Sequence, residues 1–505
     1  MIGIINKRAP NNYMNSKVGI TLLLMIIVLL GASLRLYKLG SNDLWFDEAL
    51  SVLSADKIEK VYSLPDVDVP YDNLALEERE ARFIHFKTVD PQPFLYYLIL
   101  KCAMSCLGKS ALSLRLVSVF FSILSILVMY KVGAEISNKK NGIYAAFLIA
   151  ISPIHIWYAQ EARQYSLSVF LMLLSVYLLL RALEREGVKY WLGFIVSSIL
   201  LIYTNYIGLV ILIAIWPLFG IKKYRASLKK CIVASVVIIL LFLPCIHIFW
   251  QHFLFVKEAF WLARPSLYSV MITFKNFNIG YSNFHFVFLP SMILFFALAF
   301  LGFFSINKKA KMFLLMFLFF PILFIFVVSQ RVPIYLDRQL IIFSPFYYLA
   351  VAKGISCIRH NVIRVSLVCL ILVFIASSIY NYFSNQMPIL PTIYHQGSYV
   401  KKPFEPAIKY IEDNWQEGDT LVYSHISVKP SFLYYQQRYD NLKQNDKNNS
   451  IYKRMWLVSS SWSRDGILGP GVQLLRERLK EQHEKVDSVE FDGIFIDLYT
   501  AEDNG

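Results

Sequence analysis

Eleven stretches of this chain are apolar over lengths close to what crosses a bilayer, and this constrains its fold more than any other feature. A helix needs about 20 apolar residues to cross roughly 30 Å of hydrocarbon. Only 17% of the 505 residues are charged, whereas soluble domains carry about 25%. The runs lie near residues 18–34, 113–133, 141–154, 165–181, 191–204, 206–220, 231–250, 287–306, 312–329, 339–353 and 364–383. We therefore predict an α-helical polytopic membrane protein.

The loops between these runs carry a consistent charge pattern. If the N-terminus is cytoplasmic, every predicted cytoplasmic loop is basic, as the positive-inside rule requires. The loops contain Lys139 and Lys140; Arg181, Arg185 and Lys189; Lys222, Lys223, Arg225, Lys229 and Lys230; Lys308, Lys309 and Lys311; and Lys353, Arg359 and Arg364. The net charge of +15 is thus a topology signal, and it does not indicate nucleic-acid binding. We predict a multi-pass protein of the cell inner (plasma) membrane.

This orientation divides the chain into two predicted domains. Residues 1–383 form the membrane domain, with a long first outer loop at 35–112, and residues 384–505 form a small extracytoplasmic α/β domain. In the tail, periodicity predicts helices at 404–415 and 472–482 and strands at 420–426, 454–460 and 493–500. The apolar stretch that begins at Pro93 is interrupted by Lys101, so we expect it to lie at the membrane interface.

Two adjacent acids, Asp47 and Glu48, follow Trp45 and Phe46 just beyond the first apolar run. Acids at a helix N-terminus complement the helix dipole, and the aromatic pair would anchor the interface. A carboxylate held at the outer membrane edge can also remove a proton from an acceptor hydroxyl. Both interpretations stand at this point.

The second polar cluster, "HFKTVDPQPF", contains His85, Lys87, Asp90 and Gln92. His85 and Asp90 are candidate ligands of a divalent metal together with Glu48, because a site needs three or more converging ligands. The alternative is ordinary solvation of a surface loop.

The third cluster, "SPIHIWYAQEARQYSL", places polar residues at the predicted outer end of the third run: His155, Gln160, Glu161, Arg163 and Tyr165. Charged groups this close to a bilayer tend to be functional when they face a cavity. They also suit a solvated turn between helices with an aromatic belt.

The fourth cluster, "RVPIYLDRQLIIFSP", contains Arg331, Asp337 and Arg338. Arg338 can bind a phosphate through charge-assisted hydrogen bonds or extend to the lipid headgroups. Together the four clusters describe an outer surface with carboxylates and arginines beside apolar grooves, which favours transfer from a lipid-phosphate donor. The chain has neither a Walker loop nor a Rossmann glycine fingerprint, so a nucleotide donor is not favoured.

Five motifs then occur in order: "LWFDEALS", "DPQPFLYYLIL", "ALSLRLVSVFFSIL", "SPIHIWYAQEARQYSL" and the Arg-Gln-Leu that begins at Arg338. They resemble the bacterial membrane glycosyltransferases of the GT-C fold, and within them the family 39 group related to protein O-mannosyltransferases and the lipid A aminoarabinose transferase. The resemblance covers about residues 18–383, and the small outer domain also fits that group.

The resemblance implies transfer of a sugar from a polyprenyl-phosphate-linked donor to a lipid, glycan or protein acceptor, with inversion. It implies that Asp47 is the base or its closest partner and that Glu48 supports it or helps to hold a metal. It makes Arg163 and Arg338 donor-phosphate contacts, with Glu161 orienting Arg163 or the acceptor.

One position departs from the family. Many relatives have His-Pro-Pro or Lys-Pro-Pro where this chain has Gln92, which brings no charge and is a poor metal ligand. Metal dependence and a charged phosphate contact at that position are therefore in doubt. Lys87 remains a candidate phosphate contact, and Asp90, Gln92, His155, Gln160 and Tyr165 remain candidate substrate contacts.

Two other classes of protein compete with this interpretation. A transporter or flippase of lipid-linked glycans also has many spans, but transporters place ionisable residues near the bilayer midplane in broken or repeated helices. A non-catalytic assembly protein that retains the fold is disfavoured by the intact acid pair at Asp47 and Glu48. We expect a glycosyltransferase.

Overall fold

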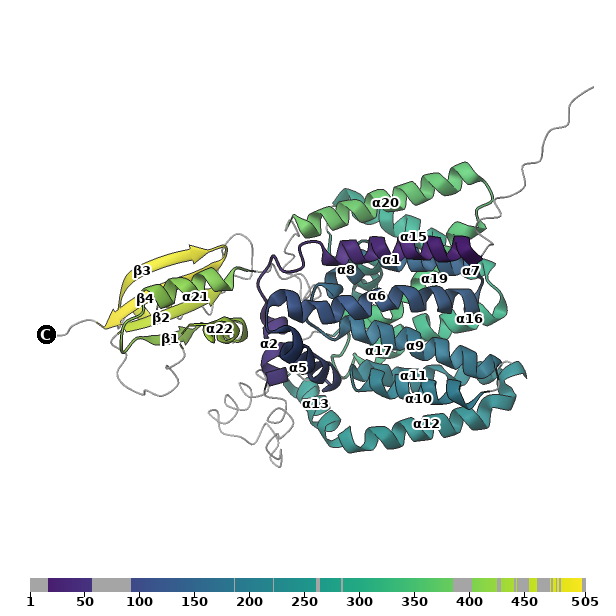
Figure 1. The fold of residues 1–505 in the computed structure, drawn as a ribbon, viewed down its shortest axis with the longest axis horizontal. Helices are drawn as coiled ribbons and strands as arrows, with labels where there is room; N and C mark the ends of the chain where they lie inside the picture. Colours follow the sequence, from purple (N-terminus) through teal and green to yellow (C-terminus); the bar gives the residue numbers. More distant parts are fainter. Residues whose placement is uncertain are drawn as a thin grey trace, which may run out of the picture.

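The structure, a computed structural model, joins a helical bundle to a small four-stranded sheet (Figure 1). It describes residues 17–56, 92–185, 187–220, 222–259, 264–282, 285–384, 402–424, 428–439, 442, 454–460, 473, 476–477, 479–480 and 483–501. In the bundle the helices are α1 (Lys17–Leu36), α2 (Phe46–Asp56), α5 (Leu95–Leu107), α6 (Ala111–Ile136), α7 (Lys139–Ile151), α8 (Pro153–Ala159), α9 (Tyr165–Glu184), α10 (Val188–Ile202), η3 (Tyr206–Leu209), α11 (Val210–Ala214), η4 (Trp216–Gly220), η5 (Lys222–Ser227), α12 (Leu228–Phe242), η6 (Leu243–Cys245), α13 (Ile246–Ala259), α14 (Leu267–Ile279), α15 (His285–Ser305), α16 (Lys308–Leu314), η7 (Leu315–Phe319), α17 (Phe320–Val328), α18 (Asp337–Leu340), η8 (Ile341–Phe343), α19 (Ser344–Cys357) and α20 (Asn361–Phe383).

Within the described ranges, eight helical stretches are long and apolar enough to span a membrane. The pair α7 and α8, bent by 57°, makes a ninth if it counts as one span. The chain is thus a multi-pass membrane protein, as the sequence predicted. The two missing members of the predicted eleven are at 191–204, where α10 has only 15 residues, and at 206–220, which is split into η3, α11 and η4. Pro217 within the last piece lacks the N–H that a continuous helix requires.

Close packing of α15 against α19 depends on two glycines. A Cβ atom on Gly302 would lie 1.9 Å from the carbonyl oxygen of Ala350, and one on Gly354 would lie 2.0 Å from that of Leu298. No side chain fits either position without moving a helix. In a membrane the hydrophobic effect does little to bring helices together, because the surrounding lipid is itself apolar. Small residues such as glycine let two helix backbones approach closely enough to associate by packing.

The C-terminal region forms a sheet of β1 (Thr420–Tyr423), β2 (Arg454–Ser460), β3 (His483–Phe491) and β4 (Ile494–Ala501) in the order β1-β2-β4-β3. Strand β1 is parallel to β2, and the other pairs are antiparallel, with Trp456 opposite Leu498. Two helices accompany the sheet, α21 (Phe404–Asp413) and α22 (Lys429–Gln436).

The sequence predicted α21, β1, β2 and β4 within a few residues, and the described parts of 472–482 are helical. It missed β3 and α22. Strand β3 lies at the edge of the sheet and reads "HEKVDSVEF", so charged residues interrupt the alternation that reveals a half-buried strand.

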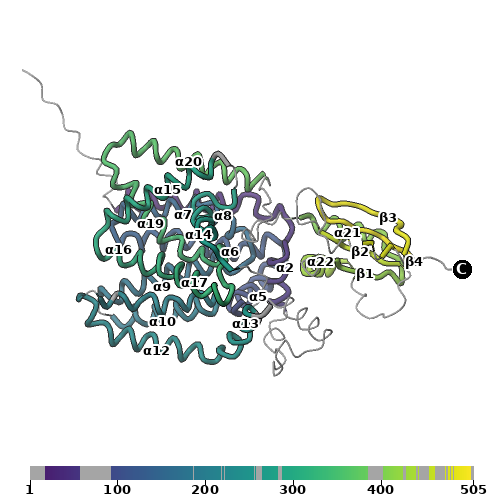
Figure 2. Tube along the Cα trace, turned by 180° about the vertical axis from the view of Figure 1, so that it is seen from behind, coloured from purple at the N-terminus to yellow at the C-terminus, as the bar shows by residue number. Residues whose placement is uncertain are grey.

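The helices α2 and α5 lie at the end of the bundle that faces the sheet (Figures 1 and 2). Helix α5 lies within the apolar stretch that begins at Pro93, and it packs against α2 and α6. Helix α2 contacts α22. The acid pair at the start of α2 therefore lies between the membrane bundle and the C-terminal sheet.

Candidate active site

The helix α2 carries both acids in its first turn. The amide of Ala49 donates to the carbonyl of Trp45 at 3.0 Å, which begins the helix. Successive residues of an α-helix point about 100° apart, so Asp47 and Glu48 face different surroundings. Each acid meets a different arginine.

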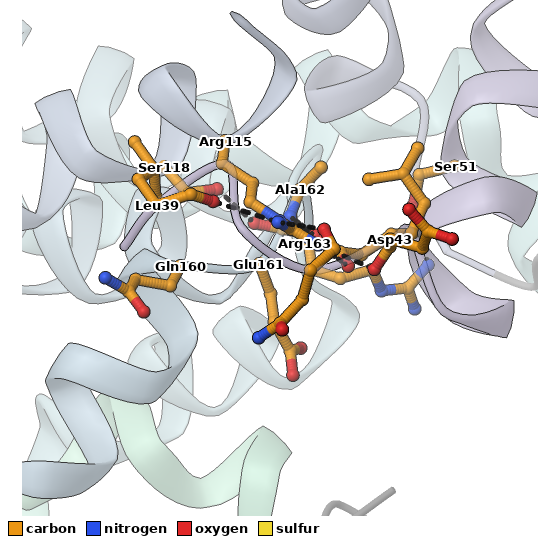
Figure 3. Close-up of polar contacts among 12 residues, drawn as sticks. Leu39, Asp43, Ser51, Arg115, Ser118, Gln160, Glu161, Ala162 and Arg163 are labelled. Carbon is orange, nitrogen blue, oxygen red and sulfur yellow. Dashed lines mark hydrogen bonds and ion pairs between the residues drawn. The ribbon is translucent and has the colours of Figure 1, made fainter. Parts of the chain in front are cut away.

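Glu48 forms a bidentate ion pair with Arg115 of α6. Figure 3 labels Arg115 near Leu39, whose carbonyl it also binds. Nε and Nη2 of Arg115 donate to Oε1 and Oε2 of Glu48, each at 2.8 Å. The Ala162 amide donates a further hydrogen bond to Oε1 at 2.9 Å. The side chains of Arg115 and Glu48 are only 1% and 0% exposed, so this pair is sealed from solvent.

Arg115 uses its remaining donors on the loop before α2. Its Nη1 donates to the carbonyls of Leu39 at 2.9 Å and Asn42 at 2.8 Å, and its Nη2 donates to that of Asp43 at 3.0 Å. This one guanidinium therefore holds both the loop and the first turn of α2. Sequence reasoning missed Arg115, although a charge in an apolar helix whose next charged residue is Lys131 is itself a signal.

Asp47 pairs with Arg338 of α18, 2.7 Å from Oδ2 to Nη1. Each side chain is about 10% exposed, so this pair is mostly buried but less completely sealed than the Glu48 pair. Arg338 is steered by its neighbour Asp337, which accepts the Arg338 amide at 2.7 Å and a hydrogen bond from Asn276 of α14. Sequence reasoning did not identify Asn276.

Arg163 reaches the same turn of α2 from the segment between α8 and α9. Its Nη1 donates to Ser51 Oγ at 2.9 Å and to the carbonyl of Asp47 at 3.3 Å. Ser118 of α6 donates to the Arg163 carbonyl at 3.1 Å. The structure therefore brings together Asp47, Arg163 and Arg338, which come from three distant parts of the sequence.

Glu161 and Tyr165 flank Arg163. Oε1 of Glu161 accepts a hydrogen bond from Trp157 Nε1 at 2.6 Å. The guanidinium of Arg163 lies 5.9 Å from the ring centroid of Tyr165, whose own ring stacks obliquely on Tyr158 at 4.6 Å. All of these side chains are buried.

Gln160 and His155 contact other helices instead of the acid pair. Gln160 Nε2 donates to the carbonyls of Arg35 and Tyr37 at 2.9 and 2.7 Å, and its Oε1 accepts from Tyr382 at 2.8 Å. His155 Nε2 lies 2.8 Å from Ser344 Oγ. These contacts tie the segment around α8 to α1, α19 and α20.

The remaining predicted site residues come from the segment between α2 and α5. Gln92 is half-buried just before α5, and His85, Lys87 and Asp90 lie outside the described residues. In the described part of the chain there is no group of three or more His, Cys, Asp and Glu side chains that would hold a metal ion. Glu48 does not suit a metal, because both its oxygens already accept hydrogen bonds in a sealed pair. No catalytic step is therefore assigned to a metal at Glu48.

Comparison with known proteins agrees with this architecture. Residues 91–250 match the family model of the dolichyl-phosphate-mannose-protein mannosyltransferases. The comparison with curated proteins finds no match.

Solved structures resemble the whole chain. ArnT from Cupriavidus metallidurans in the apo state superposes with a TM-score of 0.56 at 12% identity, covering 95% of this chain and 98% of that one. ArnT bound to undecaprenyl phosphate gives a TM-score of 0.55 at 12% identity, covering 96% and 98%. The Archaeoglobus fulgidus oligosaccharyltransferase in complex with Zn and sulfate gives 0.51 at 13% identity, covering 95% and 73%.

The fold is therefore that of the GT-C membrane glycosyltransferases. The family match covers residues 91–250 of that fold, and the likeness to ArnT covers nearly the whole chain. They give no support to a transporter.

Proposed function

We propose that this chain transfers a sugar from a polyprenyl-phosphate-linked donor to an acceptor hydroxyl, with inversion, at the outer face of the inner membrane. The observation that carries the proposal is the less completely sealed ion pair of Asp47 and Arg338, with Arg163 anchored on the same turn. A phosphate leaving group needs positive charge, and an acceptor hydroxyl needs a base, and these three residues supply both.

In the proposed reaction the acceptor oxygen attacks the anomeric carbon as the bond from that carbon to the donor phosphate breaks. The electron pair leaves on the phosphate, where Arg338 and Arg163 stabilise the added negative charge. The proton of the acceptor hydroxyl passes to Asp47. Attack opposite the leaving group inverts the anomeric centre.

The ion pair suggests how Asp47 becomes a base. In the structure Oδ2 of Asp47 is engaged by a hydrogen bond from Arg338 Nη1 at 2.7 Å. A donor phosphate competes for the same guanidinium, so binding of the donor would release the carboxylate for the acceptor. Asp47 would then be free to act as the base only when a donor is bound.

A lipid-phosphate donor is supported by one of the structural neighbours, which was solved with undecaprenyl phosphate bound. We propose the same class of lipid here, with the sugar and the acceptor left open. We also propose residues 1–383 as the catalytic membrane domain, with the N-terminus cytoplasmic, and residues 384–505 as an extracytoplasmic domain.

The roles of the other candidates divide by their contacts. Glu161, two residues before Arg163, accepts a hydrogen bond from Trp157, and the Tyr165 ring lies near the Arg163 guanidinium, so we propose Glu161 and Tyr165 as supports of the donor site. Gln160 and His155 are proposed to brace helices. Lys87, Asp90 and Gln92 remain proposed contacts of the substrate from the outer loop.

The test is mass spectrometry of surface glycans and glycolipids from otherwise identical cells with and without this chain. We expect one sugar residue to disappear from one class of molecule and to return when the chain is supplied again. Asp413→Asn, an exposed acid on α21, serves as the matched control and should restore the glycan fully. An unchanged glycan profile, with the chain confirmed in the membrane, would contradict transferase activity.

A further inference from the structure

The helix that carries Asp47 is held at both ends by the C-terminal domain. The two adjacent residues Tyr434 and Tyr435 of α22 make the contacts. Both side chains are buried, at 4% and 2% exposed. Their rings meet edge to face at 4.7 Å, and the guanidinium of Arg438 lies 5.5 and 5.0 Å from the two ring centroids. The rings of Tyr434 and Tyr435 therefore pack against each other and against Arg438.

Tyr435 contacts the residues that lead into α2. Its hydroxyl accepts a hydrogen bond from the amide of Leu44 at 2.8 Å, next to Asp43. The Asp43 carboxylate accepts the amide of Glu405 at 2.9 Å, which adds a second link to the C-terminal domain. Burial raises the pKa of Asp43, while the bond from Glu405 and the charge of Arg115 oppose that rise.

Tyr434 acts at the other end of α2 through an intermediary. Its hydroxyl donates to the carbonyl of Lys109, in the turn between α5 and α6. The ammonium of Lys109 pairs with Asp56, the last residue of α2, with N to O distances of 2.9 and 2.8 Å. The two tyrosines thus reach opposite ends of an 11-residue helix, and α22 itself packs against α2 between them (Figure 1).

The contacts at the start of α2 continue into the candidate active site. The carbonyl of Asp43 accepts from Arg115, and Arg115 holds Glu48. Asp47 lies one residue before Glu48. A displacement at Tyr435 is therefore transmitted by hydrogen bonds and one turn of helix to the proposed base.

We propose that Tyr435, with Asp43, is a positioning residue through which the C-terminal domain aligns α2 and its Asp47 carboxylate for transfer. The inference rests on the proposed function, because it treats Asp47 as the base. Arg163 and Arg338 come from other elements, so a shift of α2 moves the base relative to the donor phosphate and leaves the backbone of both arginines in place.

Hydrogen exchange on the full-length chain in lipid nanodiscs tests the alignment without any substrate. Tyr435→Phe leaves the buried amide of Leu44 without its partner, and Asp43→Asn weakens the same junction from the opposite side. In both variants the amides of residues 44–50 should exchange about three- to tenfold faster, as expected for the loss of one buried hydrogen bond. The amides of β2 and β4 should keep their protection.

Tyr410→Phe is the matched control. It removes a tyrosine hydroxyl that donates to Asp487 within the same domain and does not contact α2. It should leave the exchange of residues 44–50 unchanged. Unchanged exchange in Tyr435→Phe, or an equal loss of protection in β2 and β4, would overturn the proposal in favour of a role in folding of the domain alone.

Turnover supplies the second readout, with the glycan that the deletion experiment identifies. Tyr435→Phe should lower kcat about three- to tenfold and raise the KM for the lipid-phosphate donor by less, because Asp47 moves with α2, whereas Arg163 and Arg338 touch α2 only through their side chains. A raised donor KM with normal kcat would overturn the alignment role. If no sugar transfer is found but Tyr435→Phe still speeds hydrogen exchange in α2, the proposed function is wrong, whereas the role of Tyr435 in positioning α2 is supported.

Discussion

Two adjacent acids of α2 meet two arginines, and the two pairs differ in almost every physical respect. Glu48 and Arg115 form a bidentate pair that is sealed from solvent and joined by the Ala162 amide. Asp47 and Arg338 meet at 2.7 Å between Oδ2 and Nη1 and keep about a tenth of their side-chain exposure. The first pair has no donor left to offer a substrate. The pair of Asp47 and Arg338 keeps some exposure, which a donor or acceptor needs in order to contact it.

The difference between the two ion pairs suggests separate roles for Asp47 and Glu48, which the sequence alone left open. A buried charge pair with satisfied hydrogen bonds fixes geometry, and removing one partner is costly because the other stays charged and buried. A partly exposed pair can be opened by a competing anion. We therefore propose a structural role for Glu48 and proton transfer for Asp47, and each role can be tested separately.

The largest expected effect is on turnover in Asp47→Asn. An amide cannot accept the proton of the acceptor, so transfer should fall by about two to four orders of magnitude. The variant keeps a hydrogen-bond acceptor for Arg338, so membrane abundance should stay near that of the parent chain. Transfer measured in isolated membranes, normalised to protein, checks this.

Asp413→Asn, on the surface of α21, is the control for that measurement. If Asp47→Asn still transfers sugar at more than about a tenth of the parent rate, proton transfer belongs to another group. The division between the two acid pairs would then be wrong.

The second prediction concerns stability and uses the other acid. Glu48→Gln leaves Arg115 charged and buried, and breaking such a pair costs about 3–5 kcal/mol. The loop that Arg115 holds should loosen together with α2. We expect a clear fall in the thermal unfolding temperature in detergent and a low abundance in membranes.

Glu412→Gln, a half-buried glutamate in α21 remote from α2, provides the control. A Glu48→Gln protein with parental stability that has lost only turnover would show that Glu48 takes part in the reaction. That result would remove the contrast between the two pairs.

The sequence was most informative where one-dimensional patterns suffice. Apolar runs located the spans, and the quoted motifs located Asp47, Arg163 and Arg338. The region 206–220 shows the limit, because composition counts apolar residues and does not report that Pro217 and short 3-10 turns break the helix. Strand β3 was missed for the opposite reason, since an edge strand tolerates charges that hide its period.

The roles of the site residues could be distinguished only from their tertiary contacts. Asp47 and Glu48 are neighbours in sequence, and only the positions of Arg115 on α6 and Arg338 on α18 distinguish them. The same holds for Gln160, which the sequence placed among the substrate contacts. Its three hydrogen bonds to other helices could not be read from "YAQEARQ".

The third prediction tests the pair of Asp47 and Arg338 from its other side. Arg338→Ala removes a charge-assisted contact worth about 1.5–3 kcal/mol to the donor phosphate. The KM for the lipid-phosphate donor should rise about tenfold or more, while the KM for the acceptor changes little. Steady-state kinetics with each substrate varied in turn measures both constants.

Arg338→Lys should recover part of the donor affinity, because it keeps the charge and loses the planar fork. Equal losses for donor and acceptor in Arg338→Ala would point to a folding role. Arg338 would then have a structural role like that of Arg115, and the Asp47 and Glu48 pairs would no longer differ in function.

The smallest expected effect comes from Ser51→Ala, one turn beyond Asp47. This change removes the hydroxyl that accepts from Arg163 at 2.9 Å and leaves the weaker contact to the Asp47 carbonyl. The loss of one such hydrogen bond is worth about 0.5–1.5 kcal/mol, so the donor KM should rise about two- to tenfold with stability nearly unchanged. Ser54→Ala, a buried serine on the same helix, is the matched control and should not affect the donor KM. A rise in donor KM that appears equally in both variants would mean that Arg163 does not depend on α2 for its position. A rise in Ser51→Ala alone would place Arg163 with Arg338 on the chemical side of the comparison, opposite Arg115.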